Sequence, residues 1–410
     1  MSNGLVLGTE TYKSGSFIFI EGQKESKNFY IIRSGKVQVT KEFQIVEEGA
    51  PPFLGPGDFF GVVSCMSGHP RIETARALTD VVLISILREQ FGELIRRNAP
   101  VAMKIIRSFS KKLRFFDSEI TRRTLKKSAE ENPEFLFDIG EYYFNQKQYN
   151  KAAYAYQKFL KYCPNHPNES QAKMRLQTMG MPFEPAPVPT SGLARQYPSD
   201  SMIFSEHEPG EELYIIQQGK VKITKIINNQ EVLLAVLQPG DIFGEMALLE
   251  NKPRSASAIA YGDVVVLAVN KANFETMVVS QPQIATKLIQ LLSERIWTAY
   301  KQLANLFFKD PLARLYDTLL TQVLKKRIPI EHKAEFTFDF GPQELIKMVG
   351  FNEDEGNMLI RKLFENKKFS LVNGKIHISD LDELEKQVSY YKKMQELEHK
   401  REMAAAKNMG

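Results

Sequence analysis

One stretch of the sequence, residues 243–258, combines residue types that could bind a phosphate. Gly244 has no Cβ, so backbone N–H groups at the start of a short following helix could approach an anion closely. Arg254 could present its guanidinium fork to phosphate oxygens, and the Ser255 hydroxyl could add another donor. Single matches of this kind are common on surface loops, but the whole string in this order is not. The stretch therefore predicts an anion site rather than an ordinary loop.

The same stretch resembles the phosphate-binding cassette of cyclic-nucleotide-binding domains, which occur in Crp/Fnr-like regulators and in regulatory subunits of cyclic-nucleotide-dependent kinases. The resemblance implies that Glu245 accepts a hydrogen bond from the ribose 2′-hydroxyl. It also implies a cyclic nucleotide as regulatory ligand, cAMP more than cGMP, with no cofactor. Two residues of the long helix that caps the pocket in this family complete the set. The predicted ligand-binding residues are Phe243, Gly244, Glu245, Met246, Ala247, Leu248, Arg254, Ser255, Ala256, Thr298 and Tyr300.

An altered copy of the stretch lies at residues 60–75. Gly61 and Arg71 are retained, but Val62 replaces the glutamate and Ile72 replaces the serine. Without the ribose acceptor, buried hydroxyls of a ligand would go unpaired. We expect this copy to be degenerate, with Gly61 and Arg71 as candidates for a weak second site.

Two β-rich modules must position these stretches, because the sequence around them is repeated. Residues 16–22 and 30–37 recur as residues 201–207 and 214–221, and each copy continues through Pro-Gly-Asp into its Phe-Gly pair. Short alternating strands between glycine turns predict an antiparallel β-roll, or jelly-roll-like barrel, and helices follow each one.

At 410 residues the chain is too long for a single core. The predicted fold class is α+β and multidomain, with two antiparallel β-roll (jelly-roll-like) barrels each followed by helices, a helical-hairpin insert and a C-terminal winged helix-turn-helix domain. The predicted domains are a first cyclic-nucleotide-binding-like domain at 1–128, a tetratricopeptide-like insert at 129–180, a Pro-rich linker at 181–190, the second cyclic-nucleotide-binding domain with its long helix at 191–309, the winged helix at 310–380 and a charged helical tail at 381–410.

The insert carries apolar and small residues at tetratricopeptide positions between residues 133 and 164. A single repeat cannot bury its own face, so we expect it to stack on a helix at residues 169–179 or on a neighbouring domain. The sequence favours a spacer over a protein-binding surface and leaves both open.

The C-terminal segment resembles the winged helix of catabolite-activator-type transcription factors at residues 310–320 and 343–350. The resemblance implies DNA contacts near the start of the second helix and in the wing. Three consecutive carboxylates at residues 353–355 would be repelled by a polyanion, which favours protein docking instead. The candidate DNA contacts are Asn352, Asn357, Arg361, Lys367, Lys368 and Lys375.

Other function classes find no support in the sequence. No nucleophile, acid–base pair or metal-ligand cluster stands out, so we expect neither an enzyme nor a metal site. The two cysteines are far apart, and no apolar run could cross a bilayer, which predicts a cytoplasmic protein without membrane insertion. The net charge of +5 is too small to imply nucleic-acid binding by itself.

The main hypothesis is a cyclic-nucleotide sensor for signal transduction and transcription regulation, with a homodimer seam along the helix predicted at residues 271–308. The first alternative is a cyclic-nucleotide-responsive adaptor that binds proteins and not DNA. The second is a structural adaptor in which both barrels are vestigial.

Overall fold

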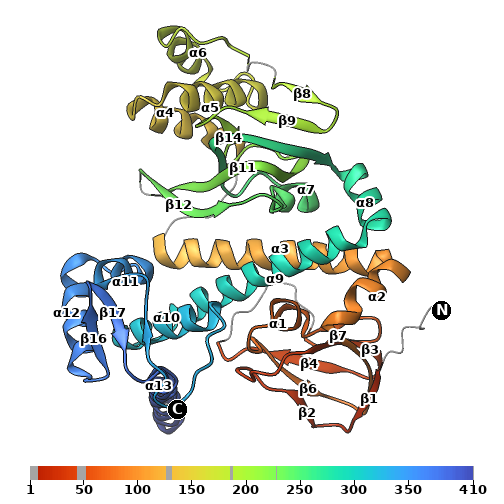
Figure 1. The fold of residues 1–410 in the computed structure, drawn as a ribbon, viewed down its shortest axis with the longest axis vertical. Coiled ribbons are helices and arrows are strands. Elements are labelled where there is room, and N and C mark those ends of the chain that lie inside the picture. The colour runs from red at the N-terminus through yellow and green to blue at the C-terminus, as the bar shows by residue number, and fades with distance from the viewer. Residues whose placement is uncertain (1–7, 44–51, 126–131, 185–187, 228, 410) are drawn as a thin grey trace. The chain divides into compact units, whose positions relative to one another are not determined.

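The computed structural model describes residues 8–43, 52–125, 132–184, 188–227 and 229–409 (Figure 1). The chain divides into two compact units, one built from Glu89–Leu292 and one from Gly4–Arg88 together with Ser293–Gly410. The predicted boundary at residues 128–129 and part of the Pro-rich linker lie outside the described residues. The units cut across the predicted domains, because residues 89–125, which follow the first β-rich module, group with the second module, and residues 293–305, which follow the second module, group with the first.

The first β-rich module, which we call the first barrel, forms two small antiparallel sheets around one apolar core. Phe19, Tyr30 and Phe60 pack ring against ring in this core. They hold the strand that ends immediately before Gly61. The elements are β1 (Gly8–Tyr12), β2 (Phe17–Phe19), β3 (Asn28–Ser34), β4 (Val37–Thr40), β5 (Phe59–Phe60), α1 (Val62–Ser67), β6 (Thr74–Ala77) and β7 (Val81–Leu87).

The second module, the second barrel, forms a seven-stranded antiparallel sheet in which the long strands β11 and β14 pair with each other. Phe204, Tyr214 and Phe243 repeat the ring packing of the first barrel. The elements are β8 (Thr190–Ser191), β9 (Ala194–Tyr197), β10 (Met202–Phe204), β11 (Glu212–Ile227), β12 (Gln230–Leu237), β13 (Ile242–Phe243), α7 (Glu245–Glu250) and β14 (Ser257–Asn270).

A helical hairpin, four further helices and the start of the long helix at residues 282–305 also belong to the unit that contains the second barrel (Figure 1). The hairpin buries its apolar face against α6 and against Met202 of the barrel, as the stacking argument predicted. Gly140 is needed where its helices cross, since a Cβ there would lie 2.6 Å from the Tyr156 ring. These elements are α2 (Phe91–Arg97), α3 (Ala99–Leu125), α4 (Leu136–Asn145), α5 (Tyr149–Tyr162), α6 (Glu169–Thr178) and α8 (Lys271–Ser280).

The C-terminal region combines helices with a three-stranded antiparallel sheet in the order β15-β17-β16. Asp310 caps α10, where Pro311 occupies the first turn, and Asn352 caps α12. One face of the charged tail helix α13, with Leu384 and Val388, packs into the core of this region. The elements are α10 (Pro311–Lys325), β15 (Phe336–Thr337), α11 (Pro342–Val349), α12 (Glu353–Glu365), β16 (Phe369–Val372), β17 (Lys375–Ile378) and α13 (Asp382–Met409).

The long helix α9 (Pro282–Asn305) begins in one unit and ends in the other. Its apolar residues Leu288, Leu292, Ile296 and Leu303 are fully buried in a single chain. A homodimer seam formed by these residues would therefore require α9 to leave its present contacts. Among the described residues, none of the helices has the length and apolar character that a bilayer-spanning segment requires.

Candidate functional site

The turn between β13 and α7 is built around Gly244. Its φ of 75° and ψ of 3° lie in the left-handed region, which favours glycine. A Cβ here would lie 2.7 Å from Nη1 of Arg254 and 3.2 Å from the Phe204 ring. The turn therefore requires glycine for both its backbone conformation and its space.

Arg254 is the charged centre of this site and is only 4% exposed. Its Cζ lies 4.2 Å from the centre of the Phe204 ring and 5.7 Å from that of Tyr214. Nη1 donates a hydrogen bond to the Gly244 carbonyl at 2.6 Å. Among the described residues, nothing accepts a hydrogen bond from the buried Nε. A buried guanidinium with an unused donor is suited to binding an anion, because burial of an unpaired charged donor is costly.

The loop between β10 and β11 forms one wall of the arginine site. His207 N–H donates to the Arg254 carbonyl at 2.8 Å, and Arg254 N–H donates to the Glu208 carbonyl at 2.8 Å. A Cβ at Gly210 would lie 2.5 Å from the guanidinium carbon and 2.6 Å from Cβ of Ala247. Sequence reasoning missed Gly210 and the supporting Phe204. The aromatic could have been found, because it recurs at the same place in both modules.

His207 in this loop is held neutral by its surroundings. Burial and the nearby Lys225 lower the pKa of its imidazole to about 4. Glu206 lies 3.5 Å from the ring, but its attraction does not outweigh these two effects.

The other predicted residues of the second cassette lie along the same turn. Glu245 stands in the first turn of α7 and is 1% exposed. Ser255 and Ala256 follow Arg254 and are half-buried. Phe243, Met246, Ala247 and Leu248 are all buried. The structure therefore brings two short segments together, residues 243–248 and residues 254–256.

The first cassette has the same backbone geometry around Gly61, with φ of 76° and ψ of 3°. Arg71 is 3% exposed, its Cζ lies 4.2 Å from the Phe19 ring, and its Nη1 donates to the Gly61 carbonyl at 3.0 Å. The difference is Glu73, which is 6% exposed and accepts a hydrogen bond from Gly61 N–H at 2.9 Å. Glu73 stands two residues after the arginine, where the second cassette has Ala256. In the first cassette a carboxylate of the chain itself thus accepts from the N–H of the cassette glycine.

Tyr300 and Thr298 were predicted to cap the second pocket, but the structure places their half of α9 in the unit that contains the first barrel. The Tyr300 hydroxyl donates to Glu21 of the first barrel at 2.5 Å. One turn earlier, Trp297 stacks on His69 with ring centres 4.2 Å apart and donates to the Pro70 carbonyl at 3.2 Å. In this structure Tyr300 therefore contacts the first cassette's module, and its contact with a ligand of the second barrel stays a prediction.

The helix that contacts the second cassette is α3, which follows the first barrel in the chain. Ser110 Oγ donates to Glu250 of α7 at 2.7 Å, and Arg114 Nε lies 3.1 Å from the same carboxylate. Arg114 Nη1 also donates to the Pro253 carbonyl at 3.2 Å, as Trp297 does to Pro70. Each cassette is therefore contacted by the helix of the other module.

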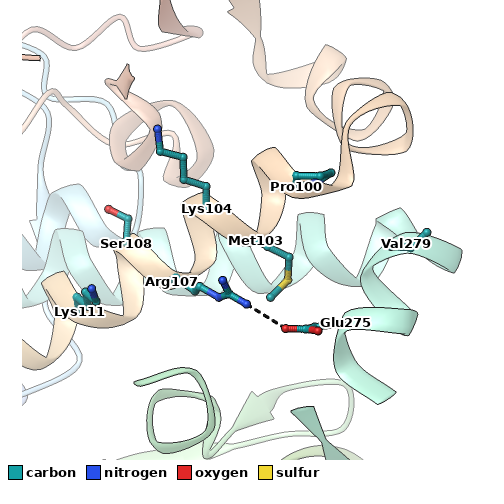
Figure 2. Close-up of a pocket in the computed structure, with 8 residues that line it drawn as sticks. All are labelled: Pro100, Met103, Lys104, Arg107, Ser108, Lys111, Glu275 and Val279. Carbon is teal, nitrogen blue, oxygen red and sulfur yellow. Dashed lines mark hydrogen bonds and ion pairs between the residues drawn. The ribbon is translucent and has the colours of Figure 1, made fainter. Parts of the chain in front are cut away.

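A separate, basic hollow lies on α3 and α8 and has a volume of about 670 Å³. Figure 2 shows Arg107 of α3 paired with Glu275 of α8, at 2.9 Å, beside Lys104 and Lys111. The lining residues are Pro100, Met103, Lys104, Arg107, Ser108, Lys111, Glu275 and Val279. These residues come from helices outside the cassette turn, so the hollow and the arginine site are distinct features.

Three candidate DNA contacts have structural partners. Asn352 caps α12 by accepting from Glu355 N–H at 2.9 Å, and Asn357 accepts from Gln343 at 3.1 Å. Lys368 lies 3.6 Å from Asp380. The basic candidates Arg361, Lys367, Lys368 and Lys375 are all exposed.

Comparison with known proteins identifies the domains. The family described as cyclic nucleotide-binding domain matches residues 9–98 and 194–281, and the family described as tetratricopeptide repeat matches residues 133–166. These matches confirm the prediction of two such domains with a repeat between them.

The chain is similar to bacterial regulators over about half its length. The cyclic AMP receptor protein of Thermus thermophilus is 30% identical over 192 residues, covering 47% of this chain and 86% of the relative. A CRP-like cAMP-activated global transcriptional regulator of Mycobacterium tuberculosis is 28% identical over 46% of this chain and 84% of the relative. The crystal structure of Thermus thermophilus catabolite activator protein is 28% identical, covers 48% of this chain and 90% of that chain, and has a TM-score of 0.29. With two cyclic nucleotide-binding domains and a tetratricopeptide repeat between them, the chain belongs to the cyclic AMP receptor protein family.

Proposed function

We propose that the protein is a sensor that binds one cyclic nucleotide, cAMP or cGMP, in its second barrel and acts as a transcription-regulator-like protein. The observation that carries this proposal is Arg254, a guanidinium buried against Phe204 beside the Gly244 turn, where Ala256 stands at the position of the carboxylate Glu73 of the first cassette. The names of the Thermus and Mycobacterium relatives both refer to cAMP, which supports cAMP as the first ligand to test.

Each part of the ligand has a counterpart in the second cassette. The exocyclic phosphate oxygens would accept from Arg254 and Ser255 and from N–H groups at the start of α7. Glu245 would accept from the ribose 2′-hydroxyl, and Met246 and Leu248 would contact the apolar face of the ligand. A cyclic phosphate carries one negative charge, which the single buried arginine balances.

The first barrel is proposed to be a structural copy that does not take up the ligand. The Glu73 carboxylate already accepts the Gly61 N–H that a phosphate would need. Two anions about 4 Å apart near a protein surface repel each other by about 4 kcal/mol, so Glu73 would exclude a phosphate. Tyr300 and Trp297 pack over the same module and are both 1% exposed. We therefore propose a stoichiometry of one ligand per chain.

The output of the sensor has two candidate forms. The relatives support a winged helix that binds DNA, with Arg361, Lys367, Lys368 and Lys375 as exposed contacts. The first turn of α12 instead supports a protein-docking adaptor, since Glu353, Asp354 and Glu355 stand there and Asn352 is used as the cap. Homodimer formation remains part of the DNA-binding proposal.

Isothermal titration of the full chain with cAMP, cGMP and linear 5′-AMP tests the ligand. We expect one site per chain for a cyclic nucleotide and weaker binding of 5′-AMP. No heat of binding with either cyclic nucleotide would overturn the sensor proposal.

Selection from random DNA duplexes, with and without the ligand, tests the output. Ligand-dependent enrichment of one sequence would establish DNA binding, whereas no enrichment from a ligand-saturated protein would favour the adaptor.

A further inference from the structure

We propose that the helical hairpin is part of the nucleotide site: Lys158 and Tyr154 of α5 hold the Glu208 side chain, and Glu208 thereby positions Arg254. Nucleotide binding and hairpin docking would then stabilise each other. This inference rests on the proposed function, because it concerns the ligand of the second barrel.

The loop between the strands β10 and β11 is hydrogen-bonded to the backbone of Arg254. The loop between β10 and β11 exchanges two backbone hydrogen bonds of 2.8 Å with Arg254, through His207 and Glu208. At Gly210 the same loop lies directly against the guanidinium, with no room for a Cβ. A displacement of this loop therefore moves Arg254, or opens the wall against which its guanidinium packs.

The side chain of Glu208 in this loop is buried, because Glu208 is only 5% exposed. Its Oε2 accepts from Ser205 N–H of the loop at 3.0 Å and from the Tyr154 hydroxyl at 2.9 Å. Its Oε1 lies 2.6 Å from Nζ of Lys158. Burial raises the pKa of Tyr154, and the Glu208 carboxylate adds to the effect, so the hydroxyl stays a donor. Among the residues that the structure describes, the hairpin thus supplies two of the three donors to this buried carboxylate.

The first barrel provides an internal comparison for Glu208. In the first barrel the same loop position is Gln23, whose carbonyl accepts from Arg71 N–H at 3.0 Å. Its Oε1 accepts from Ile20 N–H at 3.5 Å, as Glu208 does from Ser205. A neutral amide therefore suffices to form the loop around a cassette arginine. The negative charge of Glu208 is matched to Lys158 of the hairpin, because a buried carboxylate needs a charged partner.

A ring contact supports the same interface. Phe135, which directly precedes α4, packs on the His207 ring with centres 5.1 Å apart. Both backbone partners of Arg254 in this loop are therefore contacted by the insert. Since coupling between two sites is reciprocal, a protein that binds and shifts the hairpin would change the affinity for the nucleotide.

The test measures the Kd for cAMP of wild type, Glu208→Gln and Lys158→Gln by isothermal titration. Glu208→Gln introduces the residue of the first barrel and keeps an acceptor for Ser205 N–H. We expect Kd to rise about tenfold in each variant, within the range by which residues that touch neither ligand alter coupling. Lys158→Arg should retain the wild-type affinity, because arginine keeps the positive charge that pairs with Glu208. Lys173→Gln removes an exposed ion pair with Glu169 on α6 and should leave Kd unchanged.

Hydrogen exchange of the α5 amides provides a readout that loss of affinity alone would not change. Saturating cAMP should slow exchange in α5 of the wild type and have less effect in Glu208→Gln at equal saturation. Unchanged Kd and unchanged protection in folded variants would overturn the inference and leave the sensor proposal intact. A wild type that binds no cyclic nucleotide would overturn both.

Discussion

Replacing Arg254 by glutamine should abolish most of the affinity for cyclic nucleotide, and Arg71 provides a matched control. Both arginines are nearly buried, at 4% and 3% exposure, and both lie 4.2 Å from a phenylalanine ring. Each also donates to the carbonyl of its cassette glycine. The two replacements therefore remove similar contacts from the folded protein, and only one removes a proposed ligand contact.

The expected magnitude follows from the burial of the charge. Removing one partner of a buried, hydrogen-bonded charge pair costs about 2–5 kcal/mol of binding free energy. This corresponds to a Kd roughly 30-fold to 4,000-fold higher. Each replacement also removes a cation–π contact worth about 2 kcal/mol when desolvated, so the two variants should lose similar folding stability.

Isothermal titration with cAMP, together with urea unfolding of each variant, separates the two effects. Arg254→Gln should lose binding while still unfolding cooperatively, and Arg71→Gln should keep the wild-type Kd with a similar loss of stability. Equal loss of affinity in both variants, or wild-type affinity in a folded Arg254→Gln protein, would refute the assignment of the ligand to the second barrel.

Three further predictions concern single side chains. Glu245→Ala should bind cAMP and 2′-deoxy-cAMP equally, whereas the wild type should prefer cAMP by about 1.5–3 kcal/mol, the usual value of a hydrogen bond to a charged group; equal binding by the wild type would contradict this role. In an Arg254→Gln background, Glu73→Ala should restore weak cAMP binding in the first barrel, and titration showing no such binding would argue against Glu73 as the excluding group. His207 has a native pKa of about 4 against 6.5 for the free side chain, so the unfolded chain takes up the proton first as pH falls. The free energy of unfolding should therefore fall between pH 6.5 and pH 4 by on the order of 3 kcal/mol. His207→Asn, which tolerates the positive φ of 68° at this position, should reduce that pH dependence in urea unfolding, and an unchanged slope would exclude His207 as its source.

Local patterns in the sequence were sufficient to predict the two β-rich modules, the hairpin between them and the core of the second cassette. Gly244 and Arg254 are separated by only nine residues, with one short helix between them, so their spacing determines that they meet. The alternation of apolar residues and the glycine turns likewise reflect contacts between neighbouring strands. Such features depend on short segments of chain, which is why a repeated pattern was enough to identify them.

The tertiary structure alone decided which distant segments meet at each cassette. Nothing in the sequence distinguished Glu73 from other glutamates. In the structure its carboxylate accepts a hydrogen bond from Gly61 N–H. Tyr300 was assigned to the nearer barrel in the sequence, but it contacts Glu21, which lies 279 residues away. The sequence did not indicate a role for Lys158, because its partner Glu208 belongs to another domain. Helical periodicity shows which side of α3, α5 or α9 is apolar but not which barrel that side covers, since the covering partner is selected by packing across the whole chain.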